Sequence, residues 1–388
     1  MMRNSNNYKW FCKICLISCF CFFLSNAYAQ ETTVLPYKVV ANKMIVEVVL
    51  NGKEVPMIFD TGGRNSISTR LKKELQTPLL QSRELTDANN NKMMVEEVTV
   101  DQVKTIDGFA SFNNISFFVF DSELFDCLGV EGFIGSDLLQ QNTIEINDQT
   151  KQITIKKGGT PSLRSNRQTL SFLPDAKGMP IINLNIGSTH EARVLFDTGS
   201  DGLLTFKTSE FTRLHQEGAL QITREGQGGG AIAASGRGNA GKQIEVGVPE
   251  IVLGGTHFVA GRAKVSNSPE TLFGYQSLTY GKVTIDYVNQ LLRFEPFNKG
   301  QVTLEPKKIW DLQLAVIDNK LVIATVWDNV KGKAEVGDIV THINGKQVKP
   351  MDFCESITQG MPVLKENDQV VLTVKTKTGI KDITITKS

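Results

Sequence analysis

An apolar run that ends in Asp-Thr-Gly occurs twice in the chain, and this repeat constrains the fold more than any other feature. Residues 57–63 read MIFDTGG, and residues 194–200 read VLFDTGS. In each copy an alternating strand and a glycine-containing turn come first, and an apolar strand then leads into the triplet. A repeat of this kind indicates two copies of one structural unit.

The likeness continues downstream of both triplets. Residues 132–139, GFIGSDLL, correspond to residues 271–278, TLFGYQSL, and each segment precedes a final pair of strands. Asp60 lies 75 positions before Gly135, and Asp197 lies 77 positions before Gly274. Since long helical periodicity is scarce, we expect a mainly β fold with two homologous lobes related by a pseudo-two-fold axis, at 31–158 and 170–298. Two polar segments rich in turn formers, 156–168 and 296–308, are the expected linkers.

The N-terminus is typical of a protein that is exported. It carries a basic region (Arg3, Lys9, Lys13), an almost wholly apolar run at 14–24 and an A-x-A cleavage site at 27–29. This pattern predicts a signal peptide at residues 1–29 and a bacterial protein of the periplasm or cell surface. The run is too short to span a bilayer comfortably, so no membrane span is expected after cleavage. A lipoprotein signal at Cys19 is the alternative, which the continuation of the apolar run past Cys19 disfavours.

Cleavage of the signal would change the charge and the cysteine count. The loss of three basic residues leaves 39 basic and 41 acidic side chains, a net charge of −2, which gives no reason to expect nucleic acid as a partner. Of six cysteines only Cys127 and Cys354 remain, far apart in sequence, and we expect two buried free thiols. The four histidines have no metal-ligand spacing, so neither a metal nor another cofactor is expected.

Two Asp-Thr-Gly turns that meet would form a two-carboxylate site. A carboxylate on a tight turn after a buried strand is held rigidly, and glycine allows one turn to approach the other closely. Asp60 and Asp197 would then lie side by side and share one proton, because two charges of the same sign that close cannot both be present. The ionised member can act as a general base on water, and the protonated member as a general acid toward a carbonyl oxygen. The expected substrate is a peptide bond in a peptide or protein.

With these motifs the chain resembles aspartic proteases of the retropepsin and pepsin type, with two lobes fused in one chain. The resemblance covers nearly all of residues 35–298 and rests on the two triplets and on the apolar-apolar-Gly segments 133–135 and 272–274. In the family these segments pack behind the catalytic turns. The resemblance implies catalytic roles for Asp60 and Asp197 and supporting roles for five neighbours: Thr61, Gly62, Thr198, Gly199 and Ser200. Both carboxylates come from one chain, so a monomer suffices for the site.

Ser200 marks a difference between the two copies, because Gly63 follows the first triplet. In pepsin-like enzymes a Ser or Thr at this position donates a hydrogen bond to the aspartate. Our hypothesis is that Ser200 donates to Asp197 and favours its ionised form, so that Asp60 holds the shared proton more often.

Enzymes of this type cover the substrate with a mobile hairpin. The glycine-rich segment 225–241, EGQGGGAIAASGRGNAG, lies where the hairpin of the second lobe is expected, with Gly228, Gly229 and Gly230 as candidates for its flexible part. Residues 87–97, with a turn-like Asn run, are the counterpart in the first lobe. A disordered surface loop is nearly as good an interpretation of the glycine-rich segment.

After about residue 305 the pattern changes, and the segment 330–348 resembles part of a PDZ domain. The resemblance rests on Val336-Gly337-Asp338-Ile339-Val340 and on a tight turn at Asn344-Gly345. PDZ domains bind peptide ends by adding a strand to a sheet edge, so a peptide ligand is the partner this resemblance implies for residues 305–388. The segment 310–314, WDLQL, stands near the expected carboxylate-binding loop but lacks its glycines, which leaves a structural or docking role open.

The sequence therefore predicts an exported aspartic endopeptidase. The alternative is a non-catalytic peptide-binding scaffold that uses the cleft and the PDZ-like domain. A third hypothesis is a processing enzyme whose flap becomes ordered on docking to one partner protein. The intact pair of triplets favours the enzyme, whereas a wide separation of the two carboxyl groups would favour the scaffold.

Overall fold

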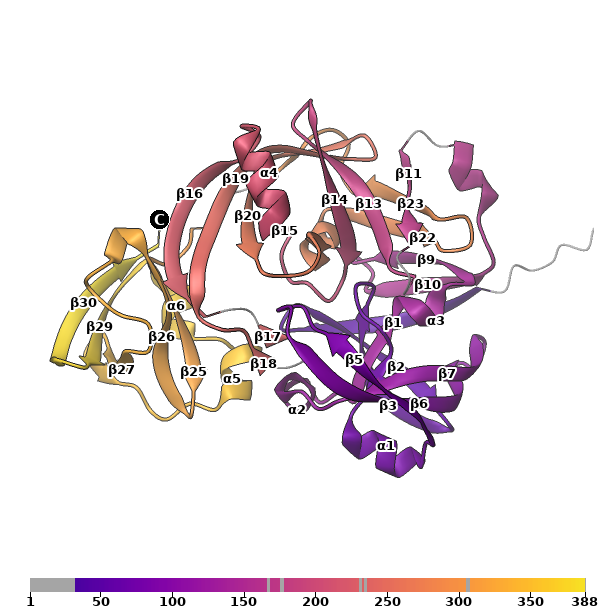
Figure 1. The fold of residues 1–388 in the computed structure, drawn as a ribbon, viewed down its shortest axis with the longest axis horizontal. Coiled ribbons are helices and arrows are strands. Elements are labelled where there is room, and N and C mark those ends of the chain that lie inside the picture. The colour runs from indigo at the N-terminus through magenta and orange to yellow at the C-terminus, as the bar shows by residue number, and fades with distance from the viewer. Residues whose placement is uncertain are drawn as a thin grey trace, which may run out of the picture. The chain divides into compact units, whose positions relative to one another are not determined.

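The computed structural model describes residues 32–165, 168–174, 178–229, 232–233, 236–304 and 308–387. The expected signal peptide with Cys19, and the flap candidate Gly230, lie outside these residues. The described part is built mainly from strands (Figure 1), which confirms the predicted mainly β class with barrel lobes. No helix in the described ranges is long and apolar enough to cross a membrane.

Six strands of the first half close into a barrel. In order around the barrel they are β2 (Lys43–Leu50), β3 (Lys53–Asp60), β8 (Gly132–Gly135), β4 (Ser66–Ile67), β7 (Ser111–Val119) and β6 (Lys92–Thr105), which pairs back to β2. The hairpin β2–β3 turns at Asn51-Gly52, where both φ angles are positive, as this turn requires. The same half also contains β5 (Leu79–Thr86) and three short helices, α1 (Thr69–Leu75), α2 (Glu123–Leu128) and α3 (Ser136–Leu139).

The second half repeats the closed set of pairings. Its barrel consists of β13 (Pro180–Ile186), β14 (His190–Asp197), β21 (Leu272–Gly274), β15 (Leu204–Lys207), β20 (Thr256–Ser266) and β19 (Gly241–Leu253), which pairs back to β13. Further elements of this half are β12 (Leu173–Pro174), α4 (Thr208–Gln216), β16 (Gln221–Gly228), β17 (Ile232–Ala233), β18 (Gly236–Arg237), η2 (Tyr275–Thr279) and β24 (Val302–Thr303). In both halves the Asp-bearing strand runs parallel to the strand that ends in glycine, with Asp60 opposite Gly135 and Asp197 opposite Gly274.

A sheet of strands from both halves joins the two barrels. Its order is β11 (Thr169–Ser171), β23 (Leu291–Pro296), β22 (Gly281–Asp286), β9 (Asn142–Asn147), β10 (Gln152–Lys157) and β1 (Thr32–Val40), and η1 (Pro161–Ser165) follows β10. The central pairing, β22 with β9, sets Val283 opposite Ile146, and both side chains are fully buried. One continuous apolar cluster contains residues of both barrels and of this sheet. The joining sheet therefore holds the two Asp-bearing turns in a fixed relation.

Residues 308–387, here called the C-terminal module, have an apolar cluster of their own. The module contains β25 (Leu312–Ile317), β26 (Lys320–Trp327), η3 (Asp328–Val330), β27 (Ile339–Ile343), β28 (Lys346–Gln347), α5 (Phe353–Thr358), α6 (Pro362–Glu366), β29 (Gln369–Thr376) and β30 (Gly379–Thr386). Strand β26 also pairs with β16 of the second half, with Gly228 opposite Thr325. The module thus extends the sheet of the second barrel.

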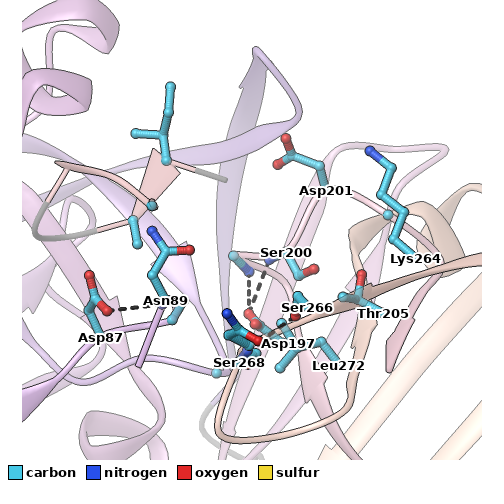
Figure 2. A pocket seen from close by; sticks show the side chains of 18 of the residues that line it. Asp87, Asn89, Asp197, Ser200, Asp201, Thr205, Lys264, Ser266, Ser268 and Leu272 are labelled. Carbon is cyan, nitrogen blue, oxygen red and sulfur yellow. Dashed lines mark hydrogen bonds between the residues drawn. The ribbon is translucent and has the colours of Figure 1, made fainter. Parts of the chain in front are cut away.

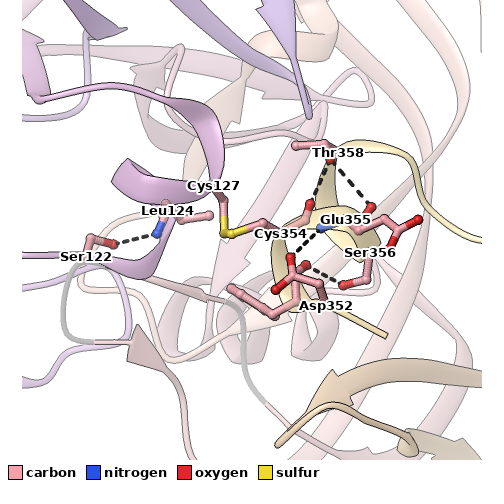
Figure 3. The surroundings of a disulfide bond; sticks show 9 residues. Ser122, Leu124, Cys127, Asp352, Cys354, Glu355, Ser356 and Thr358 are labelled. Atoms are coloured by element: carbon pink, nitrogen blue, oxygen red, sulfur yellow. Dashed lines mark hydrogen bonds between the residues drawn. A yellow bond between two sulfur atoms is a disulfide. The ribbon is translucent and has the colours of Figure 1, made fainter. Parts of the chain in front are cut away.

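A disulfide links Cys127 in α2 to Cys354 in α5 (Figure 3), so the expectation of two free thiols is wrong. The two residues are 227 positions apart, and their Cα atoms lie 4.5 Å from each other. A disulfide needs Cα atoms within about 7 Å, a condition that the fold meets and that spacing in the sequence does not reveal. The module is therefore tied covalently to the first half and by hydrogen bonds to the second.

Candidate active site

The structure brings the two Asp-Thr-Gly turns together, so that Asp60 and Asp197 lie beside each other, each against the glycine of the opposite turn. Each aspartate is the last residue of its strand, β3 or β14. The backbone N–H of Gly62 donates to Asp60 Oδ1 over 2.9 Å, and that of Gly199 donates to Asp197 Oδ1 over 2.8 Å. These bonds fix each carboxyl group in the same orientation relative to its own turn.

Only glycine fits at the third position of each triplet. A Cβ atom added to Gly62 would lie 2.3 Å from Asp197 Cγ, and one added to Gly199 would lie 2.5 Å from Asp60 Cγ. The glycine of each turn is therefore packed against the carboxyl group of the opposite turn. This close approach is what allows the two carboxyl groups to meet, as the sequence predicted from the glycines.

The two threonines tie the turns together through a reciprocal set of hydrogen bonds. The backbone N–H of Thr61 donates to Thr198 Oγ1 over 3.0 Å, and the backbone N–H of Thr198 donates to Thr61 Oγ1 over 3.1 Å. Each hydroxyl then donates across to the opposite strand, Thr61 to the carbonyl of Phe196 and Thr198 to that of Phe59. Both threonines are fully buried, so all four bonds are shielded from water.

Ser200 reaches Asp197 through its backbone, since its N–H lies 3.2 Å from Asp197 Oδ1 (Figure 2). A side chain at Gly63 would place its Cβ atom 2.6 Å from Asp60 Oδ2, which explains why the first copy has glycine there. Burial raises the pKa of both aspartates, and the negative charge of Asp60 raises the pKa of Asp197 further. Both effects favour one proton shared by the two carboxyl groups, and the assignment of that proton to Asp60 stays a prediction.

Lys43 is a site residue that the sequence did not reveal. Its ammonium group, from the first strand of the first barrel, donates to the carbonyl oxygen of Gly199 and to Asp201 Oδ1, each over 2.5 Å. The positive charge lowers the pKa of both Asp60 and Asp197, against the effect of burial. Lys43 thus links the first barrel to the second Asp-bearing turn and favours one ionised carboxyl group.

Support behind the turns comes from the apolar-apolar-Gly segments and from a buried tyrosine. A Cβ atom on Gly135 would lie 2.5 Å from the carbonyl oxygen of Gly63, so this glycine packs directly behind the first turn. The hydroxyl of Ser136 donates to the carbonyl of Thr61 over 2.6 Å and lies 2.8 Å from the hydroxyl of Tyr287. Burial raises the pKa of Tyr287, so its hydroxyl stays protonated beside the site. Ser136 and Tyr287 had no signal in the sequence beyond their places after the repeated segments.

Both aspartates line a cavity of about 1230 Å³. The turn between β5 and β6 and the strands β17 and β18 contribute to its wall. The side chain of Asn89, between β5 and β6, donates to the carbonyl oxygen of Gly236 in β18 over 3.4 Å. Figure 2 shows Asn89 across the cavity from Asp197 and Ser200. The cavity is larger than the 300–1,000 Å³ typical of small-molecule sites and has room for an extended peptide.

The described flap candidates are not in a free hairpin. Gly228 pairs with Thr325 of β26, and the backbone N–H of Gly229 donates to the carbonyl oxygen of Ala324 over 2.9 Å. A Cβ atom on Gly226 would lie 2.4 Å from the carbonyl oxygen of Val326. In this strand the glycines permit the close approach of β26, so at these positions they serve packing rather than the flexibility that we expected.

Residues 46–138 match a family described as aspartyl protease. No curated protein matches the chain. The matched range contains the first Asp-Thr-Gly triplet and Gly135, which supports a protease function at the general level. The described ranges hold no group of three or more His, Cys, Asp or Glu side chains arranged to bind a metal ion.

Proposed function

We propose that the protein is an aspartic endopeptidase that hydrolyses peptide bonds with water activated by Asp60 and Asp197. The observation that carries the proposal is the close approach of the two Asp-Thr-Gly turns, whose aspartates line one cavity of peptide size. Two carboxyl groups that share one proton provide a base and an acid at the same place. Their contact also argues against the scaffold hypothesis, for which we had expected a wide separation.

The mechanism uses the shared proton in two steps. In the arrangement that we propose, ionised Asp60 removes a proton from water as the water oxygen attacks the carbonyl carbon of the scissile bond. Protonated Asp197 donates to the carbonyl oxygen, which becomes a hydroxyl of the tetrahedral intermediate. The proton on Asp60 then passes to the amide nitrogen as the C–N bond breaks. Asp197 takes back its proton from the intermediate, and the pair returns to its starting state. No metal or other cofactor takes part in this proposed mechanism.

We also propose that the chain is exported after cleavage of residues 1–29. It would then consist of two protease lobes, at 31–158 and 170–298, and a PDZ-like domain at 305–388. The N-terminal pattern supports export to the periplasm or cell surface. So does the Cys127–Cys354 disulfide, because disulfides persist in oxidising compartments. The strand order β30-β29-β27-β26-β25 with two short helices supports a PDZ-like assignment of the C-terminal module.

The test is a digest of a peptide library by the chain from Gln30 onward, scanned from acidic to neutral pH. Asp197→Asn and Asp60→Asn variants serve as matched controls, because each keeps the shape of the turn and removes one titrating carboxyl group. We expect cleavage by the wild type and a loss of at least a thousand-fold in both variants. Cleavage that survives in either variant, or no cleavage at any pH, would refute the proposal and favour the scaffold.

A further inference from the structure

One face of each barrel, beside the Asp-bearing turn, is built differently in the two halves. Strand pairing sets four residues in register across that face, in a row that begins two positions before the aspartate. The row is Ile58, Phe133, Ser66 and Phe118 in the first half, and Leu195, Leu272, Thr205 and Lys264 in the second. Side chains in register on neighbouring strands lie on the same face of the sheet. Lys264 is therefore the counterpart of Phe118.

A helix covers this face in the first half only. Residues 120–131 connect β7 to β8 and contain α2, whose Phe125 joins a buried apolar cluster with Ile58 and Phe118. Phe118 is only 4% exposed. In the second half the described residues 267–271 make the corresponding connection, from β20 to β21, and contain no helix. All four residues of the second row line the cavity, so the face that α2 covers in one half is an open pocket in the other.

The open pocket presents hydrogen-bond donors to the cavity. Its polar side chains, here called the basic pocket, are those of Thr205, Lys264, Ser266 and Ser268 (Figure 2). Ser266 Oγ accepts the N–H of Ser268 over 3.2 Å, and Ser268 Oγ accepts the N–H of Glu270 over 3.4 Å. Since a hydroxyl can accept and donate at the same time, both O–H groups remain able to donate to a ligand. Together with the ammonium group of Lys264, they suit an anionic group.

The positive charge of Lys264 has no ion-pair partner among the described residues. The carboxylates near it have other partners. Glu245, opposite Lys264 in β19, is buried and pairs with Arg262 over 3.4 Å. Asp201 pairs with the ammonium group of Lys43. The cavity therefore holds an uncompensated positive charge at Lys264, which a carboxylate of a bound molecule would complement.

We propose that the basic pocket binds the carboxylate of an Asp or Glu side chain of the substrate, and that Lys264 determines this preference. Leu195, at the start of the row, lies two positions before Asp197 in the same strand, so the bound side chain belongs to a residue close to the scissile bond. Phe118 fills the corresponding place in the first half, so the preference applies to one side of the bond only. This inference rests on the proposed peptidase function, because it names the substrate preference of that site.

The test measures kcat/KM for pairs of peptides that differ only in Glu or Gln, placed in turn at each position around a cleaved bond. At one position the wild type should prefer Glu about ten-fold, and this ratio should fall in about 1 M salt. In Lys264→Met, which removes the charge, the ratio should fall to about one, and Lys264→Glu should prefer Lys over Gln at the same position. Lys381→Glu is the matched control and should keep the wild-type ratio, because Lys381 is exposed in β30 and does not line the cavity.

A lower rate in the Lys264 variants with an unchanged ratio of Glu to Gln peptides would overturn the inference, because Lys264 would then be only structural. Binding of a fluorescent peptide pool with Glu at one position, and of the same pool with Gln, to Asp197→Asn gives a readout that needs no catalysis. If the wild type cleaves nothing but the Glu pool binds about ten-fold more tightly, and Lys264→Met removes the difference, the peptidase proposal fails and the basic pocket stands. Cleavage by the wild type without any preference for Glu has the opposite meaning.

Discussion

Replacement of Thr61 by valine tests whether the reciprocal threonine bonds hold the two halves together. Valine has nearly the same shape but no hydroxyl, so the substitution removes the bond from Thr198 N–H and the bond to the carbonyl of Phe196. Both groups that lose their partner are buried between the turns. An unsatisfied buried group costs about 1–3 kcal/mol, so we expect the free energy of unfolding to fall by about 2–6 kcal/mol. This is a large part of the 5–15 kcal/mol that stabilises an ordinary protein.

The assay is thermal unfolding of the purified full chain, followed by circular dichroism. At about 2 °C per kcal/mol for a large chain, the midpoint should fall by about 4–12 °C. Thr284→Val is the matched control, because its buried hydroxyl has no hydrogen-bond partner among the described residues. That variant should leave the midpoint within about 1 °C of the wild type or raise it. A midpoint for Thr61→Val that equals the one for Thr284→Val would refute the reasoning.

Three further predictions concern the aspartate pair and the disulfide. Gly199→Ala should reduce kcat at least a hundred-fold, because its Cβ atom would displace the carboxyl group of Asp60. Gly202→Ala is the control and should be active, because the nearest atom to its added Cβ would be 3.9 Å away. Equal activity of the two variants would contradict this prediction. Lys43→Met should move both limbs of the pH–rate profile to higher pH, because Lys43 lowers the pKa of both aspartates. Lys43→Arg keeps the positive charge and should restore the wild-type profile. A lower rate with unmoved limbs would mean that Lys43 is only structural. Replacement of both disulfide cysteines by serine should lower the free energy of unfolding by about 2–5 kcal/mol, because the loop that the disulfide closes is long. A urea titration measures this change. An unchanged midpoint would show that the module is held in place without the disulfide.

The repeat in the sequence predicted the central part of the fold. Equal spacing from each aspartate to its later glycine predicted two equivalent units, and in the structure Asp60 and Asp197 face Gly135 and Gly274 in the same parallel register. The glycines of the triplets were assigned to the close approach of the turns, and the contact of Gly62 with Asp197 is of that kind. Backbone conformation and local spacing decide features of this kind, so a sequence carries a signal for them.

Contacts between distant segments could not be predicted in this way. The disulfide, the bonds from Lys43 to the second turn and the pairing of β16 with β26 each join residues about 100 or more positions apart. Nothing in the local sequence of either partner specifies the other. The glycines at 226 and 228 illustrate the difficulty, because flexibility and close packing against a second strand require the same residue type.

The joining of the module to both halves has a consequence for biosynthesis. Residues 324–327, which bond to β16 and Gly229, and Cys354, which bonds to Cys127, are made after the strands of both barrels. The two barrels can close their own strand pairings earlier, since those lie within residues 43–135 and 180–274. The cavity therefore lacks its lining from β25, β26 and α5 until the module has been made. A nascent chain can therefore hold both aspartates in their turns before the cavity around them is complete.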